Sequence, residues 1–433
     1  MQLNKEILRL AVPNILSGLT VPLLGMVDMF LMGQQQSQIF MGAVALGGVI
    51  FNIVYWNFAF LRMSVSGLAA QSVGRQNEHE SAQVLFRGLL IALVGGLLLL
   101  LTQSLVERIS FGLLNGSAEV KEIAKVYFYT RIWAAPAAIL LFVFSGWFIG
   151  LQNAVYPMWI ALTVNIVNVF ASYILVTYFG LQARGIALGS VIAQYSGLLL
   201  CCILFLKKYR WVFHYFKLKE VLVVQHIKDF LNVSGAIFFR TLLIVIVFTF
   251  FTSSSAGMGD DVLAANGALI QFLFLFSYFS DGFANAAEAL VGKFYGAKDR
   301  LMLGKSIKRL FMWGLATAIL FTILYYFAGE RLITFFTPNP KVVAVARPFL
   351  VWIIILPIMS FATFILDGIY IGVTASRAML ITMFISTAFF FFLPFYLLLP
   401  IVGNNAIWIS MLSFMLCRSI SQGILLKKVI QIE

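Results

Sequence analysis

The sequence predicts an all-α polytopic membrane protein in which about twelve transmembrane helices form two pseudo-symmetric six-helix lobes around a central cleft. Composition, recurring apolar runs and an internal repeat predict this fold. Of the 433 residues, 61% are hydrophobic and only 11% are charged, and the mean hydropathy is +0.97. Water-soluble globular domains are not expected to reach these values. A membrane β-barrel would instead show short alternating segments.

Apolar runs recur from end to end, and each is close to the ~20 residues that a helix needs to cross ~30 Å of hydrocarbon. Several are longer, which predicts tilt, kinks or extension beyond the lipid. Run lengths and helix-breaking residues place the spans at 6–33, 42–73, 84–113, 120–151, 156–178, 185–207, 228–256, 262–295, 306–328, 342–373, 379–400 and 404–426.

The formal net charge of +13 reflects membrane topology and does not indicate nucleic-acid binding, because of where the basic residues lie. They gather in the loops on one side of the predicted helices, which we therefore expect to be cytoplasmic together with both termini. We expect a multi-pass protein of the plasma membrane, the inner membrane in a bacterium. The loops on this side contain Arg75, Lys207, Lys208, Arg210, Lys217, Lys219, Lys293, Lys298, Arg300, Lys305, Lys308, Arg309 and Arg377.

The second half of the chain repeats residues of the first half at separations of 221 or 222 positions. Parallel repeats of this kind are related by an axis along the membrane normal and enclose a cleft. We predict a first lobe at 1–207, a cytoplasmic linker at 208–227 and a second lobe at 228–433. The aromatic residues among the lysines of the linker suit a segment lying on the cytoplasmic leaflet. The repeated residues are Pro136, Gly146, Gly150 and Met158, then Pro357, Gly368, Gly372 and Met379.

Asp28 is the single carboxylate in the apolar run 8–33. A charged side chain at membrane depth costs at least ~2.5 kcal/mol, so it usually faces a wet cavity and has a function. Asp28 is therefore the first candidate for coupling transport to a proton or another cation.

Other charged residues also fall inside predicted spans. Each has two interpretations: a structural ion pair or a side chain that reaches the interface, and a residue lining the cleft or a second-lobe site. Asp281 and Glu288 are seven positions apart and project from one helix face. The repeat matches Asp281, Glu288 and Asp367 with Ala59, Ser66 and Ser145, so the acids are not repeated. The set comprises Arg62, Arg131, Arg240, Asp281, Glu288, Asp367 and Arg418.

Asn165, Asn168 and Ser172 form a polar stripe on the fifth predicted span. Buried amides often only join helices, each contributing ~0.6 kcal/mol. The alternative is that they line the same cavity as Asp28 and help to hold a cation or protonated solute.

The sequence contains no nucleotide-binding GxxxxGK[ST] loop and no HExxH pair, and its three histidines lie in or near loops. Cys201, Cys202 and Cys417 lie in predicted spans without metal-ligand spacing. We therefore expect no enzyme, no cofactor and no metal other than a transported sodium ion. Uphill transport would then depend on an ion gradient.

Several segments resemble the multidrug and toxic compound extrusion (MATE) transporters, and in particular their DinF-like branch, over essentially the whole chain. The resemblance implies two six-helix lobes that export cationic or amphipathic compounds in exchange for protons or sodium. It also implies that Asp28 is protonated, that Pro13 permits a bend and that Asn168 belongs to the same site. Ser172 stands where many relatives have an aspartate, which disfavours sodium there. The segments are Pro13–Asn14, Met26–Asp28, Leu61–Gly74, Asp281–Glu288, Tyr295–Asp299 and Leu366–Gly372.

The predicted function is a cation-coupled multidrug efflux antiporter, with protons favoured and sodium second, that works by alternating access as a monomer. Its partners would be the bilayer and small organic cations or amphipathic substrates, with no nucleic acid. A flippase for lipids or lipid-linked precursors is an alternative, but it would be expected to have a more basic central cavity. A non-transporting receptor or channel suits duplicated lobes and buried acids less well.

Overall fold

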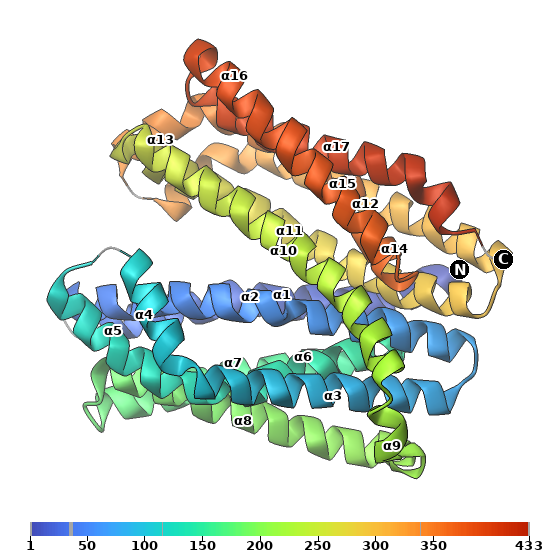
Figure 1. Cartoon of the computed structure of the whole chain (residues 1–433). Coiled ribbons are helices and arrows are strands. Elements are labelled where there is room, and N and C mark those ends of the chain that lie inside the picture. The colour runs from blue at the N-terminus through green and yellow to red at the C-terminus, as the bar shows by residue number, and fades with distance from the viewer. Residues whose placement is uncertain (1, 34–37, 115, 338, 432–433) are drawn as a thin grey trace. The chain divides into compact units, whose positions relative to one another are not determined.

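The computed structural model describes residues 2–33, 38–114, 116–337 and 339–431, except for the side chains of 21–33 and 38. Short 3₁₀ segments η1 (Ile132–Ala134), η2 (Arg210–Tyr215) and η3 (Arg347–Phe349) and a π-helical turn η4 (Ala388–Phe392) connect or interrupt the helices. The helices (Figure 1) are α1 (Gln2–Gly33), α2 (Gln38–Gly74), α3 (Glu78–Leu101), α4 (Gln103–Leu113), α5 (Ala118–Arg131), α6 (Ala135–Gly150), α7 (Val155–Thr177), α8 (Gln182–Tyr209), α9 (Leu218–Val221), α10 (Val224–Gly257), α11 (Asp260–Gly296), α12 (Arg300–Phe336), α13 (Pro340–Ala346), α14 (Leu350–Gly372), α15 (Ser376–Thr387), α16 (Leu393–Val402) and α17 (Asn405–Val429).

The predicted fold class is confirmed. Within the described residues, eleven helices are long and apolar enough to cross a membrane, and α1 carries the first predicted span. Predicted boundaries differ from the structure in places: the span expected at 306–328 is α12 at Arg300–Phe336, and the span expected at 84–113 ends at Leu101, with α4 as a separate helix. Thr102 separates α3 from α4 with φ −96° and ψ 10°, and its hydroxyl donates to the carbonyl of Leu98.

The chain divides into two compact units, which we describe separately. The first-half unit comprises residues 16–230, and the second-half unit comprises residues 231–433 together with residues 1–15. The N-terminal part of α1 thus packs with the second half. Gly282 of α11 makes this packing close, since a Cβ there would lie 2.9 Å from the carbonyl oxygen of Ala11. The predicted lobe boundaries at 207 and 228 stay a prediction.

The internal repeat appears in the helix boundaries and in the turns. Helix α2 runs over Gln38–Gly74 and α11 over Asp260–Gly296, so both ends are displaced by 222 positions. The turns after them contain Gln76 and Lys298, each with φ 55°. Side chains rarely adopt this left-handed conformation. The duplication therefore extends to the backbone of individual turns.

The predicted glycine pairs explain how the repeated helices cross. A Cβ on Gly150 of α6 would lie 2.7 Å from the carbonyl oxygen of Ser66, and a Cβ on Gly372 of α14 would lie 2.7 Å from that of Glu288. Both contacts are too close for any other residue type. Glycine thus lets α6 pack directly on the backbone of α2, and α14 on that of α11.

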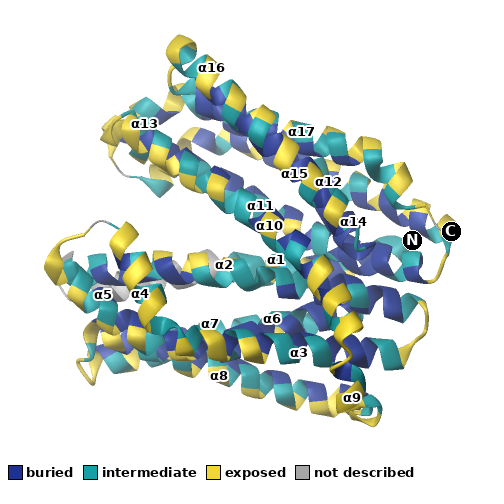
Figure 2. Cartoon of the chain, viewed as in Figure 1, coloured by how far each residue is buried: buried dark blue, intermediate teal, exposed yellow. Residues whose placement is uncertain are grey.

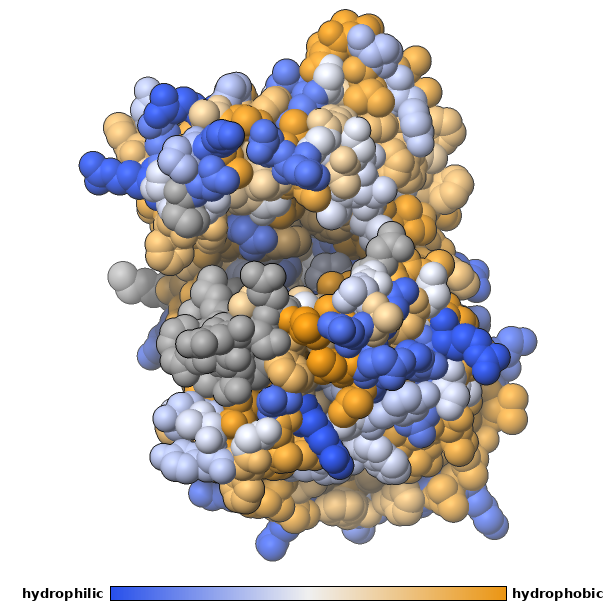
Figure 3. Space-filling model, turned by 90° about the vertical axis from the view of Figure 1, so that its left-hand side faces the viewer, coloured by the Kyte–Doolittle hydropathy of each residue, from blue (hydrophilic) through white to orange (hydrophobic). Residues whose placement is uncertain are grey.

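Each unit has its own apolar interior, and many apolar side chains also point outward (Figure 2). Trp147 is fully buried in the first-half unit and Trp408 in the second-half unit, whereas Leu98 is 56% exposed and Phe170 63% exposed. Figure 3 shows many hydrophobic residues on the visible surface, with hydrophilic residues among them. Exposed apolar side chains are expected on helices that lie in lipid.

Candidate transport site

A chain of neutral polar groups links three helices of the first-half unit. Asn165 Nδ2 of α7 donates to Thr20 Oγ1 of α1 at 2.5 Å. Asn168 Nδ2, one turn further along α7, donates to Ser190 Oγ of α8 at 3.0 Å. Ser172 Oγ lies 3.5 Å from Asn168 Oδ1, at the limit of a hydrogen bond. The predicted stripe on α7 therefore makes its contacts with two different neighbouring helices.

The members of this stripe differ in burial. Asn168 is 2% exposed and Ser172 is fully buried, whereas Asn165 is half-buried. Gly189 of α8 allows the close approach at Ser172, because a Cβ on Gly189 would lie 2.8 Å from the backbone nitrogen of Ser172. Asn168 and Ser172 thus lie within the interface between α7 and α8. Asn165, by contrast, is less buried and reaches α1.

Asp28 lies in α1, but its side chain is outside the described residues. Thr20 is eight positions earlier in the same helix, or about 12 Å along the axis. Pro13 lies inside α1, which continues as a helix on both sides of it. The division between the two compact units falls shortly after it, between residues 15 and 16.

Arg62 and Arg131 lie at different places in the first-half unit. Arg62 is half-buried on α2, next to Gly146 of α6 at the helix crossing. Arg131 ends α5, where its guanidinium donates to the hydroxyl of Tyr127 and lies 5.0 Å from the centroid of the Phe51 ring.

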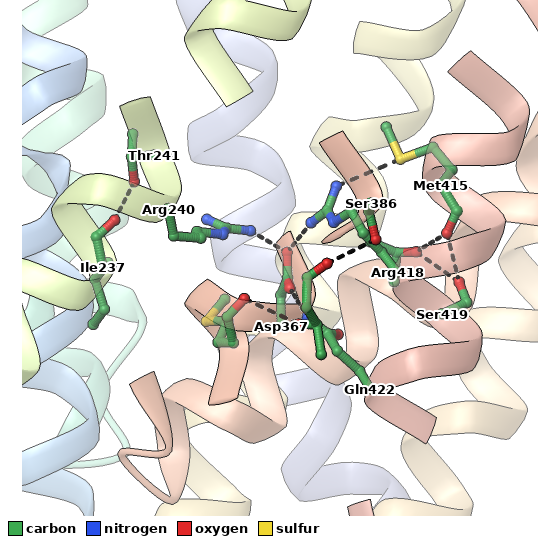
Figure 4. A network of polar contacts seen from close by, with 12 residues as sticks. Ile237, Arg240, Thr241, Asp367, Ser386, Met415, Arg418, Ser419 and Gln422 are labelled. Carbon is green, nitrogen blue, oxygen red and sulfur yellow. Dashed lines mark hydrogen bonds and ion pairs between the residues drawn. The ribbon is translucent and has the colours of Figure 1, made fainter. Parts of the chain in front are cut away.

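The second-half unit contains a buried charge cluster, which Figure 4 shows. Asp367 of α14 binds the guanidinium groups of Arg240 of α10 and Arg418 of α17 through the same oxygen, Oδ2; the Arg418 contact measures 2.5 Å. Its other oxygen, Oδ1, accepts from Gln422 Nε2 at 3.0 Å. Asp367 is 8%, Arg240 6% and Arg418 4% exposed. Arg418 therefore does not reach the surface, and three helices are joined through one carboxylate.

Asp281 and Glu288 occupy different environments although they share α11. Asp281 is exposed, whereas Glu288 is 1% exposed at the crossing with Gly372. The acid that pairs with Arg240 is Asp367 of α14.

Sequence reasoning missed Thr20, Ser190 and Gln422 as members of these networks. Gln422 follows Arg418 by four positions and so lies on the same helix face, a signal that was available. Thr20 and Ser190 carried no such signal, because isolated hydroxyls are common in membrane helices. Within the described residues, no group of three or more His, Cys, Asp or Glu side chains could hold a metal ion.

These features define a multi-pass helical membrane protein of duplicated architecture with polar groups buried in both halves. The MatE family model matches residues 13–174 and 236–397, one match in each half. The chain therefore belongs to the MatE family, whose members are transporters and not enzymes.

The similarity extends over nearly the whole chain. DNA damage-inducible protein F of Escherichia coli is 33% identical over 426 residues, which cover 96% of this chain and 91% of that protein. The probable multidrug resistance protein NorM of Thermotoga maritima is 21% identical, with 80% of this chain and 75% of that protein covered.

Solved MATE structures have the same fold. An outward-facing multidrug resistance MATE family transporter of the MOP superfamily superposes with a TM-score of 0.89 at 17% identity, covering 99% of this chain and 96% of that one. The bent form of the Vibrio cholerae transporter VcmN gives 0.88 at 16% identity, with 99% and 97% covered.

Proposed function

We propose that the protein is a proton-coupled efflux antiporter that exports cationic or amphipathic organic compounds by alternating access. The predicted lobes 1–207 and 228–433, joined by the linker 208–227, would alternate around one site as a monomer. Names of relatives such as multidrug resistance protein NorM support this substrate class. We further propose that it acts in the bacterial inner membrane, with both termini in the cytoplasm.

The observation that carries the proposal is the polar link from α7 to α1. Asn165 reaches Thr20 on the helix that contains Asp28, so hydrogen bonding in the first half is connected to the element with the candidate proton acceptor. Ser172, one turn beyond Asn168, is neutral and adds no second charge. Asp28 is thus the proposed coupling residue, with Pro13 allowing α1 to bend, and Asn165 and Asn168 as its polar surroundings.

The second half offers a poorer coupling site. The carboxylate of Asp367 already binds two guanidinium groups and one amide. A coupling ion would have to displace one of these charge-assisted contacts, which are roughly twice as strong as neutral hydrogen bonds. This supports a proton at Asp28 over a sodium ion at Asp367. Arg240 and Asp367 are then proposed to be structural, while Asp281, Glu288 and Arg62 stay candidates for lining the cleft.

In the proposed cycle, the outward-facing protein takes up a proton at Asp28. Protonation removes the negative charge, which weakens the hold on a cationic substrate and shifts the conformational equilibrium toward release. Loss of the proton on the other side restores the charge and the affinity for the next substrate.

Transport in proteoliposomes tests this proposal. A proton gradient and a sodium gradient are imposed separately, and efflux of a panel of cationic dyes is followed for wild type and Asp28→Asn. We expect the proton gradient alone to drive export, and Asp28→Asn to abolish it. Asp261→Asn, which alters an exposed acid at the start of α11, is the control and should transport normally. Full proton-driven export by Asp28→Asn would overturn the role of Asp28.

A further inference from the structure

The linker segment, residues 207–224, contains η2 and α9 and presents apolar and basic side chains together. We propose that its outer face docks on the anionic phospholipid headgroups of the leaflet that it adjoins. The inference goes beyond transport itself and rests on the proposed cytoplasmic position of the linker. Figure 1 shows the label α9 beside this segment at the lower right.

The inner face of the linker segment is fixed on α3. Val212 is fully buried and Val221 is 2% exposed. Gln83 Nε2 of α3 donates to the carbonyl of Tyr215 at 3.0 Å, and the rings of Phe86 and Phe216 pack edge to face at 4.8 Å between centroids. These contacts hold the segment against α3.

The acid in this segment is neutralised internally. Glu220 accepts from Lys217 Nζ at 3.0 Å and lies 2.6 Å from His79 Nε2 of α3. The other basic residues of the segment are exposed, and within the described part of the chain none of them forms an ion pair. These are Lys207, Lys208, Arg210 and Lys219. The outward charge is therefore positive.

Large apolar side chains of the same segment are also exposed. Phe213 is 54%, Phe216 50%, Leu218 57% and Leu222 47% exposed, and Figure 2 shows exposed residues around α9. Phe216, Leu218 and Leu222 lie outside the helices that are apolar enough to span the membrane, so burial in the hydrocarbon core does not explain them. Several exposed large apolar side chains in one short segment favour an interaction surface.

Position and charge favour lipid as the partner. The segment connects α8, which ends at Tyr209, to α10, which begins at Val224. Both helices are candidate membrane spans, so the segment lies where they leave the bilayer. Lysine and aromatic side chains together bind the boundary between headgroups and acyl chains, and anionic lipid attracts the cations. A soluble nucleic acid would not account for the exposed phenylalanine and leucine side chains.

Hydrogen exchange of the full-length protein in nanodiscs tests the proposal. Exchange of the linker amides is compared in phosphatidylcholine alone and with about 30% phosphatidylglycerol. We expect the anionic lipid to slow exchange in 210–224, and roughly 1 M salt to remove the effect because the Debye length falls to ~3 Å.

Charge variants separate lipid binding from folding. The triple variant Lys207→Gln, Arg210→Gln and Lys219→Gln should lose the response to anionic lipid, since three charges change affinity for the surface on the order of a hundredfold. The matched control replaces three exposed cations outside this segment, Arg184→Gln, Arg331→Gln and Lys341→Gln, and should respond as wild type does.

Three outcomes would overturn the proposal: equal exchange in both lipids, an undiminished response in the linker variant, or the same protection by RNA or an acidic peptide without anionic lipid. Dye efflux by the linker variant in proteoliposomes, measured in parallel, keeps this result separate from the proposed antiport. Normal antiport with no lipid response would reject the docking surface alone.

Discussion

The two halves of the protein cross their helices in the same way but bury different polar groups beside the crossing. A Cβ added at Gly150 or at Gly372 would lie 2.7 Å from a backbone carbonyl oxygen in each case. Close to these crossings, Ser145 in the first half corresponds to Asp367 in the second. The backbone geometry is thus duplicated while the side-chain chemistry is not.

The difference arises because a close helix crossing and a buried polar group place different requirements on the sequence. A close helix crossing needs a residue without a side chain, so glycine is required in both halves. A buried polar group only needs a partner. On α7 and α8 the first half meets that requirement with neutral amides and hydroxyls. The second half also has a neutral network around Asn266, but it adds an ion cluster whose members lie on α10, α14 and α17.

The largest expected effect separates Asp367 from its counterpart. Asp367→Asn leaves two guanidinium groups buried without their carboxylate and should lower the free energy of unfolding by about 3–5 kcal/mol. Ser145→Ala should change it by no more than about 0.5 kcal/mol. Thermal unfolding in detergent measures both variants.

An apolar replacement of the whole cluster shows whether charge or packing is responsible. Arg240→Met, Asp367→Leu and Arg418→Met in one variant should restore most of the stability that Asp367→Asn loses, because no unpaired charge is left. A stable Asp367→Asn protein would contradict the assigned pairing.

A smaller effect tests the equivalence of the crossings. Gly150→Ala and Gly372→Ala should each destabilise by about 1–3 kcal/mol, because the added methyl group forces the helices apart. The control is Gly304→Ala in α12, where an added Cβ would meet nothing within 4 Å. This substitution should be neutral or stabilising by up to ~1 kcal/mol. Clearly unequal losses at the two crossings would break the comparison.

The neutral network should be weaker than the ion cluster. Asn168→Ala removes the hydrogen bond to Ser190 and should cost about 0.6 kcal/mol in unfolding free energy. In a double-mutant cycle with Ser190→Ala the two losses should not add. Asn165→Ala breaks the link to α1 instead, so its loss of unfolding free energy should add to that of Asn168→Ala. Additive losses for Asn168→Ala with Ser190→Ala, and non-additive losses for Asn168→Ala with Asn165→Ala, would contradict the assigned pairs.

The smallest expected effect concerns the linker between the halves. Hydrogen bonds from Lys217 and His79 lower the pKa of Glu220 below its ordinary value. The stabilisation is therefore present above the ordinary pKa and is lost as pH falls through the lowered value. Protease sensitivity of 216–224 should rise slightly below about pH 4. Glu220→Gln should remove this pH dependence, and a persistent dependence would point to another group.

The sequence predicted the helical fold class and the internal repeat that relates helices of the two halves. Proline, glycine and methionine recurring at a nearly constant offset indicated the repeat, and the glycines mark the crossings that the structure shows. The break at Thr102 was not predicted, because the apolar run passes through it without interruption. Such a break depends on local backbone geometry more than on hydropathy.

The sequence also identified Arg240, Asp367 and Arg418 as charges at membrane depth, but it could not pair them. Arg240 and Asp367 are 127 positions apart, and Asp367 and Arg418 are 51 apart. Periodicity relates residues a few turns apart in one helix. It contains no information on which helices become neighbours.

Composition, span lengths, the repeat and the cost of a lone Asp28 carboxylate are properties of the sequence alone, since hydrophobicity and backbone spacing act locally. The tertiary structure decided which polar groups meet: Asn165 with α1, Asn168 with α8, and Asp367 with two arginines. A charge in a low-dielectric interior is tolerated only beside its partner, and only the packed helices bring that partner within hydrogen-bonding distance.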